Sequence, residues 1–333
     1  MVTSPSAAPP TEEMLDRAAA VLDGVAHRTP VLTSSELDRR TDARVVLKCE
    51  CFQRTGSFKF RGAYTAVSSL PDATRRRGVV THSSGNHGQA VAMAARLFGV
   101  PATIVVPDNA PRAKVAAIEG YGARRVPCAP NMASREATAA REIEATGGVL
   151  VHPYDDGWIV AGQSTAAREL LAECPDLDVL LAPVGGGGLL SGTSLTASRH
   201  ASDIRVIGAE PAAADDAARS FASGRLEDNA SANTLADGLR GRLSLMTLGV
   251  IRRHAERIVT VDEDAIVGAM RLLWERLKIV IEPSAAVPVA ALLDGTLDLQ
   301  GARVGVIVSG GNVDLDRLPW HRPATLPPAD DAP

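Results

Sequence analysis

From residue 78 onward, short apolar runs alternate with amphipathic runs, and this alternation limits the fold more than any other feature of the sequence. Short apolar runs predict strands, and apolar residues three or four positions apart predict helices. Strands joined by helices run parallel, because a parallel pair needs a crossover connection. The expected strands are 78–81, 102–106, 123–126 (ended by Pro127) and 149–151, with helices at 86–98, 111–119 and 133–145 between them.

A second alternation begins near residue 160, and its expected strands are 179–182, 205–208, 258–261 and 304–308. A chain of 333 residues is long for one domain, so two lobes are expected. We predict an α/β fold in which each lobe is a mostly parallel sheet flanked by helices. A discontinuous large lobe would comprise residues 1–75 and 156–320, a small lobe residues 76–155, and a flexible tail residues 321–333.

Composition excludes several classes of function. The net charge is −4 and only 22% of residues are charged, so no basic surface for nucleic acid is expected. No apolar run approaches the length of a membrane span. The first ten residues contain neither a basic segment nor an apolar signal core, so we expect a cytoplasmic protein. All four cysteines (Cys49, Cys51, Cys128 and Cys174) are expected to be buried and reduced.

Lys59 is unusual in its setting, the run Thr55–Ala63 of glycine, apolar and hydroxyl residues after an expected strand. A buried ammonium group is costly unless it is paired or chemically converted. Formation of a Schiff base with a carbonyl cofactor removes the charge and makes the lysine a covalent catalyst. A solvated lysine at the start of a helix is the alternative interpretation.

Three loops rich in glycine or serine follow expected strands, which is where open α/β sheets bind ligands. Residues 83–88 (SSGNHG) open a helix and could bind a carboxylate or phosphate. Four glycines at 185–188 let an anion approach the backbone without a Cβ atom in the way, but their spacing is not that of a dinucleotide site. Residues 309–312 (SGGN) place a hydroxyl group after the last strand. For each loop, a simple turn or helix cap is the alternative.

The combination of a buried lysine, a phosphate loop and a polar group for a ring nitrogen is typical of pyridoxal phosphate binding. A phosphate or nucleotide sensor without catalysis would use the glycine loops but would have no need of Lys59. That class of protein is therefore kept as the non-enzymatic alternative.

These motifs, in order along residues 12–318, resemble those of the fold-type-II pyridoxal phosphate enzymes, whose fold is like that of tryptophan synthase β. Within that group the chain is most similar to the serine/threonine dehydratase and serine racemase family. The resemblance implies Lys59 as the Schiff-base lysine, with Phe58 packed beside the cofactor. It also implies Asn86 at the ring 3′-oxygen and Ser309 at the pyridine nitrogen. The phosphate would be bound by Gly185, Gly186, Gly187, Gly188 and Leu189, and the substrate carboxylate by Ser83, Ser84, Gly85, Asn86 and His87.

The family implies that Lys59 removes the α-proton of a β-hydroxy-α-amino acid such as L-serine or L-threonine, which is converted into a 2-oxo acid and ammonia. A neutral Ser309 does not force protonation of the ring nitrogen, and this favours prompt β-elimination. Ser84 occupies the position that in serine racemases delivers a proton to the opposite face. Amino-acid racemisation is therefore an alternative activity.

The segment Glu210–Asp216 resembles the divalent-cation site of the family, with Glu210, the carbonyl of Ala214 and Asp216 as ligands. Ligands that are all oxygen atoms suit Mg²⁺, Ca²⁺ or Mn²⁺. An acidic helix start is the alternative interpretation.

Two arginines bear on the choice of substrate. Arg135 matches a position that in racemases can meet a second carboxylate, so threo-3-hydroxyaspartate is a further candidate substrate; a solvated helix arginine is the alternative. Arg242 stands where the racemase pattern has small hydroxyl residues. The family also implies a homodimer, and because the chain has 333 residues we expect no regulatory domain for isoleucine.

Overall fold

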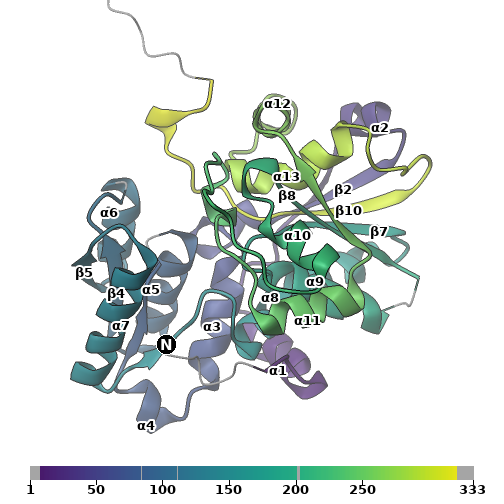
Figure 1. The fold of residues 1–333 in the computed structure, drawn as a ribbon. Coiled ribbons are helices and arrows are strands. Elements are labelled where there is room, and N and C mark those ends of the chain that lie inside the picture. Colours follow the sequence, from purple (N-terminus) through teal and green to yellow (C-terminus); the bar gives the residue numbers. More distant parts are fainter. Residues whose placement is uncertain (1–7, 84, 111, 201–202, 321–333) are drawn as a thin grey trace, which may run out of the picture.

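The structure is a computed structural model that describes residues 8–83, 85–110, 112–200 and 203–320. Two separate sheets form the two lobes, and helix α3 (Lys59–Ser69) runs between them (Figure 1). This confirms the predicted α/β fold with parallel-sheet lobes.

The larger sheet has six strands in the order β1-β2-β10-β7-β8-β9. Within the described residues, β1 pairs antiparallel with β2, and every other neighbouring pair of this sheet is parallel. The strands are β1 (Val31–Thr33), β2 (Arg44–Cys49), β7 (Val179–Pro183), β8 (Arg205–Pro211), β9 (Arg257–Val261) and β10 (Arg303–Val308). β1 escaped prediction because three residues, none of them buried, are too few to show an alternating pattern.

Helices cover both faces of this sheet, as a buried parallel sheet requires. Alternate residues of β7 and β10 point into two different apolar cores, one on each face. The first core includes residues of α2 (Ser35–Thr41), α12 (Glu263–Leu277) and α13 (Pro283–Leu293). The second includes residues of α8 (Gly157–Glu173), α9 (Gly188–His200), α10 (Asp216–Ser223) and α11 (Leu245–His254), and α1 (Glu12–Leu22) packs against α8.

The smaller sheet has the order β5-β4-β3-β6 and is entirely parallel. Its strands are β3 (Val79–Thr81), β4 (Ala102–Pro107), β5 (Arg124–Cys128) and β6 (Val149–Leu150), and its helices are α4 (Asp72–Arg75), α5 (Asn86–Phe98), α6 (Arg112–Gly120) and α7 (Met132–Thr146). The prediction that Pro127 ends its strand was wrong. β5 lies at the edge of the sheet, where a residue without an N–H group is tolerated, and the strand continues to Cys128.

Two expectations from composition can be compared with the structure. Cys49 and Cys128 are buried, whereas Cys51 and Cys174 are only partly buried, so the expectation of four buried cysteines was wrong for two of them. All four are free thiols. Among the described residues, no helix combines the length and apolar character needed to cross a membrane.

Candidate active site

Backbone hydrogen bonds hold the lysine segment against the loop that follows β10. Phe58 N donates to Ser309 O at 3.0 Å, and Gly311 N donates to Gly56 O at 2.9 Å. Gly56 has φ of +72°, and a Cβ atom there would lie 2.5 Å from Asn312 Oδ1, so both the conformation and the space require glycine. These contacts place two loops that are far apart in the sequence side by side at the site.

Lys59 is the first residue of helix α3 and is partly buried. Its Nζ donates to the carbonyl oxygen of Pro153 at 2.8 Å and lies 5.2 Å from the centre of the Phe58 ring. Burial lowers the pKa of Lys59 to about 8, although the carboxylate of Glu282 acts in the opposite direction. An appreciable fraction of this amine is therefore neutral, and nucleophilic, near pH 8.

Asn86, the first residue of α5, joins the small lobe to the large one. Its Nδ2 donates to Glu282 Oε1 at 2.7 Å, and its Oδ1 accepts from Asn312 Nδ2 at 2.8 Å. Asn312 Nδ2 also donates to Thr55 O at 2.7 Å. The amide of Asn86 is therefore held in one orientation. Glu282 is a site residue that sequence reasoning missed, because an acidic residue before a proline also reads as an ordinary helix start.

The loop between β3 and α5 carries the expected substrate-carboxylate residues. A Cβ atom on Gly88 would lie 1.9 Å from Ser83 O, so the tight turn requires glycine. His87 is buried, and its Nε2 bonds Val151 O at 2.9 Å. Burial, with a contribution from the charge of Lys59, lowers the pKa of His87 well below its usual value, so the ring is neutral. Ser84 lies outside the described residues.

The glycine run connects β7 to the start of α9, and side chains press closely on it. A Cβ atom on Gly186 would lie 2.1 Å from Tyr154 Cδ1, so the Tyr154 ring rests on this glycine. Gly187 has φ of +83°, which glycine adopts without strain. Among the described residues, no backbone carbonyl accepts from the N–H groups of Gly186, Gly187 or Gly188. These free donors at a helix start are suited to an anion.

The segment 151–156, which returns the chain to the large lobe, touches each of these parts. Val151 O meets His87, Pro153 O meets Lys59, and Tyr154 covers Gly186. The side chain of Asp156 then caps α8. Sequence reasoning missed this segment. Its only signal was its position directly after the last strand of the small lobe.

Arg135 and Arg242, the arginines with a bearing on substrate, differ in their partners. Arg135 Nε is buried without a hydrogen-bond partner in the described chain. Burial lowers the pKa of His82, and the positive charge of Arg135 adds to this effect. Arg242 is half exposed; its Nη1 pairs with Asp228 Oδ1 at 2.7 Å, and this pairing raises the pKa of Arg242.

Glu210 lies near the end of β8 and Asp216 is the first residue of α10. Both side chains are buried, as is Ala214 in the turn between them. Glu210 accepts from Ala217 N at 3.2 Å and from Ala218 N at 2.6 Å, as a helix cap would. Asp216 Oδ1 accepts from Asn229, but its Oδ2 is buried without a partner in the described chain. Burial raises the pKa of Glu210 to about 8 and that of Asp216 to about 6.

No group of three or more histidine, cysteine or acidic side chains that could hold a metal ion occurs in the described ranges. A cation at the Glu210–Asp216 pair would therefore need backbone or water oxygens as its other ligands.

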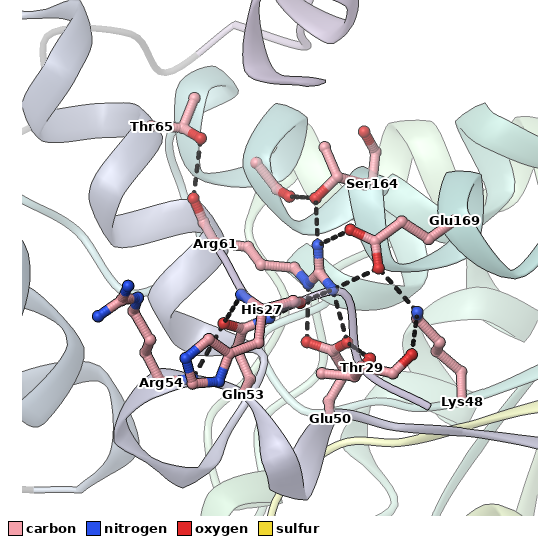
Figure 2. A network of polar contacts seen from close by, with 12 residues as sticks. His27, Thr29, Lys48, Glu50, Gln53, Arg54, Arg61, Thr65, Ser164 and Glu169 are labelled. Atoms are coloured by element: carbon pink, nitrogen blue, oxygen red, sulfur yellow. Dashed lines mark hydrogen bonds and ion pairs between the residues drawn. The ribbon is translucent and has the colours of Figure 1, made fainter. Parts of the chain in front are cut away.

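A buried ionic network surrounds Arg61, which belongs to the lysine segment (Figure 2). Arg61 is fully buried; it makes two hydrogen bonds to Glu50, at 2.7 and 2.8 Å, and two to Glu169, at 2.6 and 2.8 Å. Lys48 Nζ also contacts Glu169, at 2.7 Å. Burial alone would lower the pKa of Arg61, but the two carboxylates outweigh it and raise the pKa. The network ties β2, α3 and α8 together two residues beyond Lys59.

Comparisons with known proteins agree with this geometry. A family model described as pyridoxal-phosphate dependent enzyme matches residues 22–310. The beta-hydroxyaspartate dehydratase of Paracoccus denitrificans (strain Pd 1222) is 48% identical over 294 residues, which cover 88% of this chain and 93% of that protein.

Two solved structures are similar along nearly the whole chain. Maize serine racemase has a TM-score of 0.90 and 42% identity, covering 93% of this chain and 95% of its own. The threonine deaminase of T.th. has a TM-score of 0.87 and 40% identity, covering 92% of this chain and 99% of its own.

Proposed function

Because the chain belongs to the family of pyridoxal-phosphate dependent enzymes, we propose that it is a dehydratase of β-hydroxy-α-amino acids. L-threonine or L-serine would be converted into a 2-oxo acid and ammonia. The observation that carries the proposal is Lys59, a partly buried amine with a lowered pKa, placed among the loops that carry Ser309, Asn86 and the glycine run. The names of two similar proteins, a dehydratase and a deaminase, support the same class of reaction.

The residues present fit the cofactor. Lys59 supplies the amine that an aldehyde requires, and the N–H groups of Gly186, Gly187 and Gly188 are free for a phosphate. The buried Ser309 follows β10 and offers a neutral hydroxyl group for a ring nitrogen. Phe58 would pack beside the cofactor, Gly185 and Leu189 would join the other glycines at the phosphate, and Asn86 would meet the ring oxygen. When bound, pyridoxal phosphate acts as an electron sink for the substrate α-carbon.

Different residues of this chain would then bind the substrate and remove its α-proton. The start of α5, with Ser83, Gly85 and His87, would bind the substrate carboxylate. The neutral form of Lys59 would take the α-proton, and a pKa close to the working pH suits a general base. Pro153 O would hold the lysine Nζ when it is not engaged with substrate.

The direct experiment offers L-threonine, L-serine and threo-3-hydroxyaspartate to the holoenzyme and measures 2-oxo acid and ammonia. Release of both products from at least one substrate is the expected result. If the enantiomers interconvert without release of ammonia, the chain is a racemase, with Ser84 as the donor on the opposite face. A colourless protein that takes up no pyridoxal phosphate would instead favour the sensor.

A second candidate substrate is a β-hydroxy amino acid with two carboxylates, favoured by the unpartnered Nε of Arg135. If this is the substrate, Arg135→Met and Arg242→Met lower kcat/KM for threo-3-hydroxyaspartate by about 10- to 100-fold, the value of a lost charge-assisted hydrogen bond. Activity on L-threonine would change little.

The matched control is Arg240→Met, because Arg240 is an exposed neighbour whose Nη2 donates to Thr234 O. Equal losses on threonine and hydroxyaspartate in the two test variants would rule out a distal carboxylate site.

We also propose a divalent cation at Glu210, the Ala214 carbonyl and Asp216. Burial raises the pKa values of both carboxyl groups, which means that their negative charge is costly in this place. A bound cation would stabilise the charged forms. Millimolar Mg²⁺, Ca²⁺ or Mn²⁺ should raise the free energy of unfolding, by about 2.7 kcal/mol at a hundredfold excess over Kd. The Tm, measured with and without a chelator, reports this change.

Asp216→Asn should abolish the response to the cation, whereas Glu275→Gln, on the exposed face of α12, should retain it. A Tm that is independent of cation and chelator in the unmodified protein would refute the site.

The remaining family expectations are proposals as well. The chain would divide into a large lobe (residues 1–75 and 156–320) and a small lobe (76–155). The phosphate loop would then lie on the large lobe and the carboxylate loop on the small lobe. The tail, 321–333, lies outside the described residues. We further propose that the protein is cytoplasmic and that it forms a homodimer. Sedimentation of the holoenzyme tests the homodimer.

A further inference from the structure

Gln163, on helix α8, is the one fully buried side chain in the described chain whose carboxamide nitrogen and oxygen both have no hydrogen-bond partner. An amide buried in this way forfeits the hydrogen bonds that it made in water, at a cost that folded proteins rarely accept. Such a group calls for a partner that is not part of the protein chain.

The position of Gln163 identifies where that partner would be. Its Oε1 lies 2.8 Å from the place where a Cβ atom on Gly188 would stand, so the amide faces the first residue of α9. On its other side, its Nε2 lies 3.1 Å from the corresponding place on Gly62 of α3. Gln163 therefore stands between the helix that begins with Lys59 and the helix that begins with the glycine run.

Glycines allow α8 to pack closely against both α3 and α9. A Cβ atom on Gly162 would lie 2.4 Å from Arg61 O, and one on Gly192 would lie 2.7 Å from Ser164 N. The side chain of Gln163 is thus clamped between α3 and α9 and has little freedom to point elsewhere.

From the burial, the missing partners and this position, we propose that Gln163 is a cofactor-binding residue whose side-chain NH₂ donates to the phosphate group at the start of α9. The proposal rests on the proposed function and deepens it. The amide nitrogen and oxygen exchange places by half a turn about the last side-chain bond, so either can face α9. With a phosphate present, only the NH₂ orientation is favourable, because both phosphate and the amide oxygen are acceptors.

The phosphate would then have a donor from the side of α8 in addition to the N–H groups of the glycine run. Because the same side chain touches α3, it would also set the distance between the phosphate and Lys59.

The test compares pyridoxal phosphate with pyridoxal, which lacks the phosphate group. Both are titrated into the full-length chain after removal of its cofactor, and the affinity is read from the visible absorbance. Gln163→Met keeps the length of the side chain but removes the donor; it should weaken pyridoxal phosphate about 10- to 100-fold and leave pyridoxal nearly unchanged. Gln163→Glu keeps the shape and adds a negative charge, so it should weaken pyridoxal phosphate further.

Inorganic phosphate provides a second measurement. It should raise the Tm of the cofactor-free wild type but not that of the Gln163 variants. Ser194→Ala is the control, because Ser194 is buried in α9, the helix whose start would hold the phosphate, and its hydroxyl already donates to Leu190 O at 2.7 Å. This control should bind both ligands as the wild type does.

An equal loss of affinity for both ligands would assign Gln163 a purely structural role and overturn the proposal, as would unchanged affinity in both variants. If Gln163→Met does not fold, the ratio of the two affinities in Gln163→Glu decides the question. If the wild type itself binds no pyridoxal phosphate, the proposed function fails rather than the role of Gln163.

Discussion

Replacing Lys59 by alanine lowers the rate of 2-oxo acid release by more than about a thousandfold while the fold persists, because the variant loses both the covalent attachment point and the general base. The lysine side chain is only partly buried, and its one hydrogen bond within the described residues is to a neutral carbonyl, Pro153 O, so its removal should leave the fold in place. Far-ultraviolet circular dichroism checks the fold, and product release checks the rate.

The site of covalent attachment can be located directly, because the chain contains only four lysines, namely Lys48, Lys59, Lys114 and Lys278. Borohydride reduction of the holoenzyme followed by peptide mass spectrometry should place the adduct on Lys59. Lys278→Asn is the control, since Lys278 is exposed beyond the end of α12 and should keep full activity. An adduct on another lysine, or an active Lys59→Ala enzyme, would contradict the assignment.

The pH dependence of attachment follows from the lowered pKa of Lys59. In the cofactor-free protein the amine becomes neutral as the pH rises through about 8, rather than through the 10.5 of an ordinary lysine. Attachment should therefore accelerate across that lower range. Between pH values of about 8 and 10.5, the unfolded chain still holds this proton and the folded chain has lost it. The free energy of unfolding of the cofactor-free protein should therefore rise with pH across this range.

Replacing Arg61 by methionine should have the largest effect on stability. Glu50 would remain fully buried without its two charge-assisted hydrogen bonds; from the described residues its side chain would keep the hydrogen bond from Thr29 Oγ1 at 2.6 Å. Breaking a buried ion pair by removing one partner costs about 3–5 kcal/mol. The free energy of unfolding, from urea denaturation in saturating pyridoxal phosphate, should fall by about this amount.

The double variant Arg61→Met, Glu50→Gln should recover part of that loss, because it removes the buried charge left behind. Arg271→Met is the control: Arg271 pairs with Glu275 on the surface, with both side chains more than half exposed, and the change should cost less than about 1 kcal/mol. A loss for Arg61→Met no greater than that of the control would show that the network contributes little.

Much of the fold could be predicted because parallel strands and their crossover helices leave local patterns. Runs such as Val179–Pro183 and residues 304–308 of β10 carry no charged residue because both faces of the sheet are covered. Elements without such a pattern were missed. Strand β1 has three residues, and α10 lies in a stretch rich in alanine, aspartate and serine. The end of β5 was misplaced because a proline at an edge strand looks like one that breaks a strand.

For the site, glycine runs and an isolated lysine carry their chemistry in the sequence itself, so the loops at 55–63, 83–88, 185–188 and 309–312 could be found as candidates. Their partners could not. Lys59 meets Pro153 O across 94 positions, and Asn86 meets Glu282 across 196. A buried glutamine or glutamate has the same letter as a solvated one, so nothing marked Gln163, Glu50 or Glu282.

The sequence by itself determined the two mostly parallel sheets, the lysine and the loops that follow the strands, because periodicity and glycine content act over a few neighbouring residues. Only the tertiary structure decided which of these loops face one another, how far burial lowers the pKa of Lys59, and which polar side chains lose their contact with water. Those properties depend on distance and solvent exclusion in three dimensions, and a linear pattern does not record either.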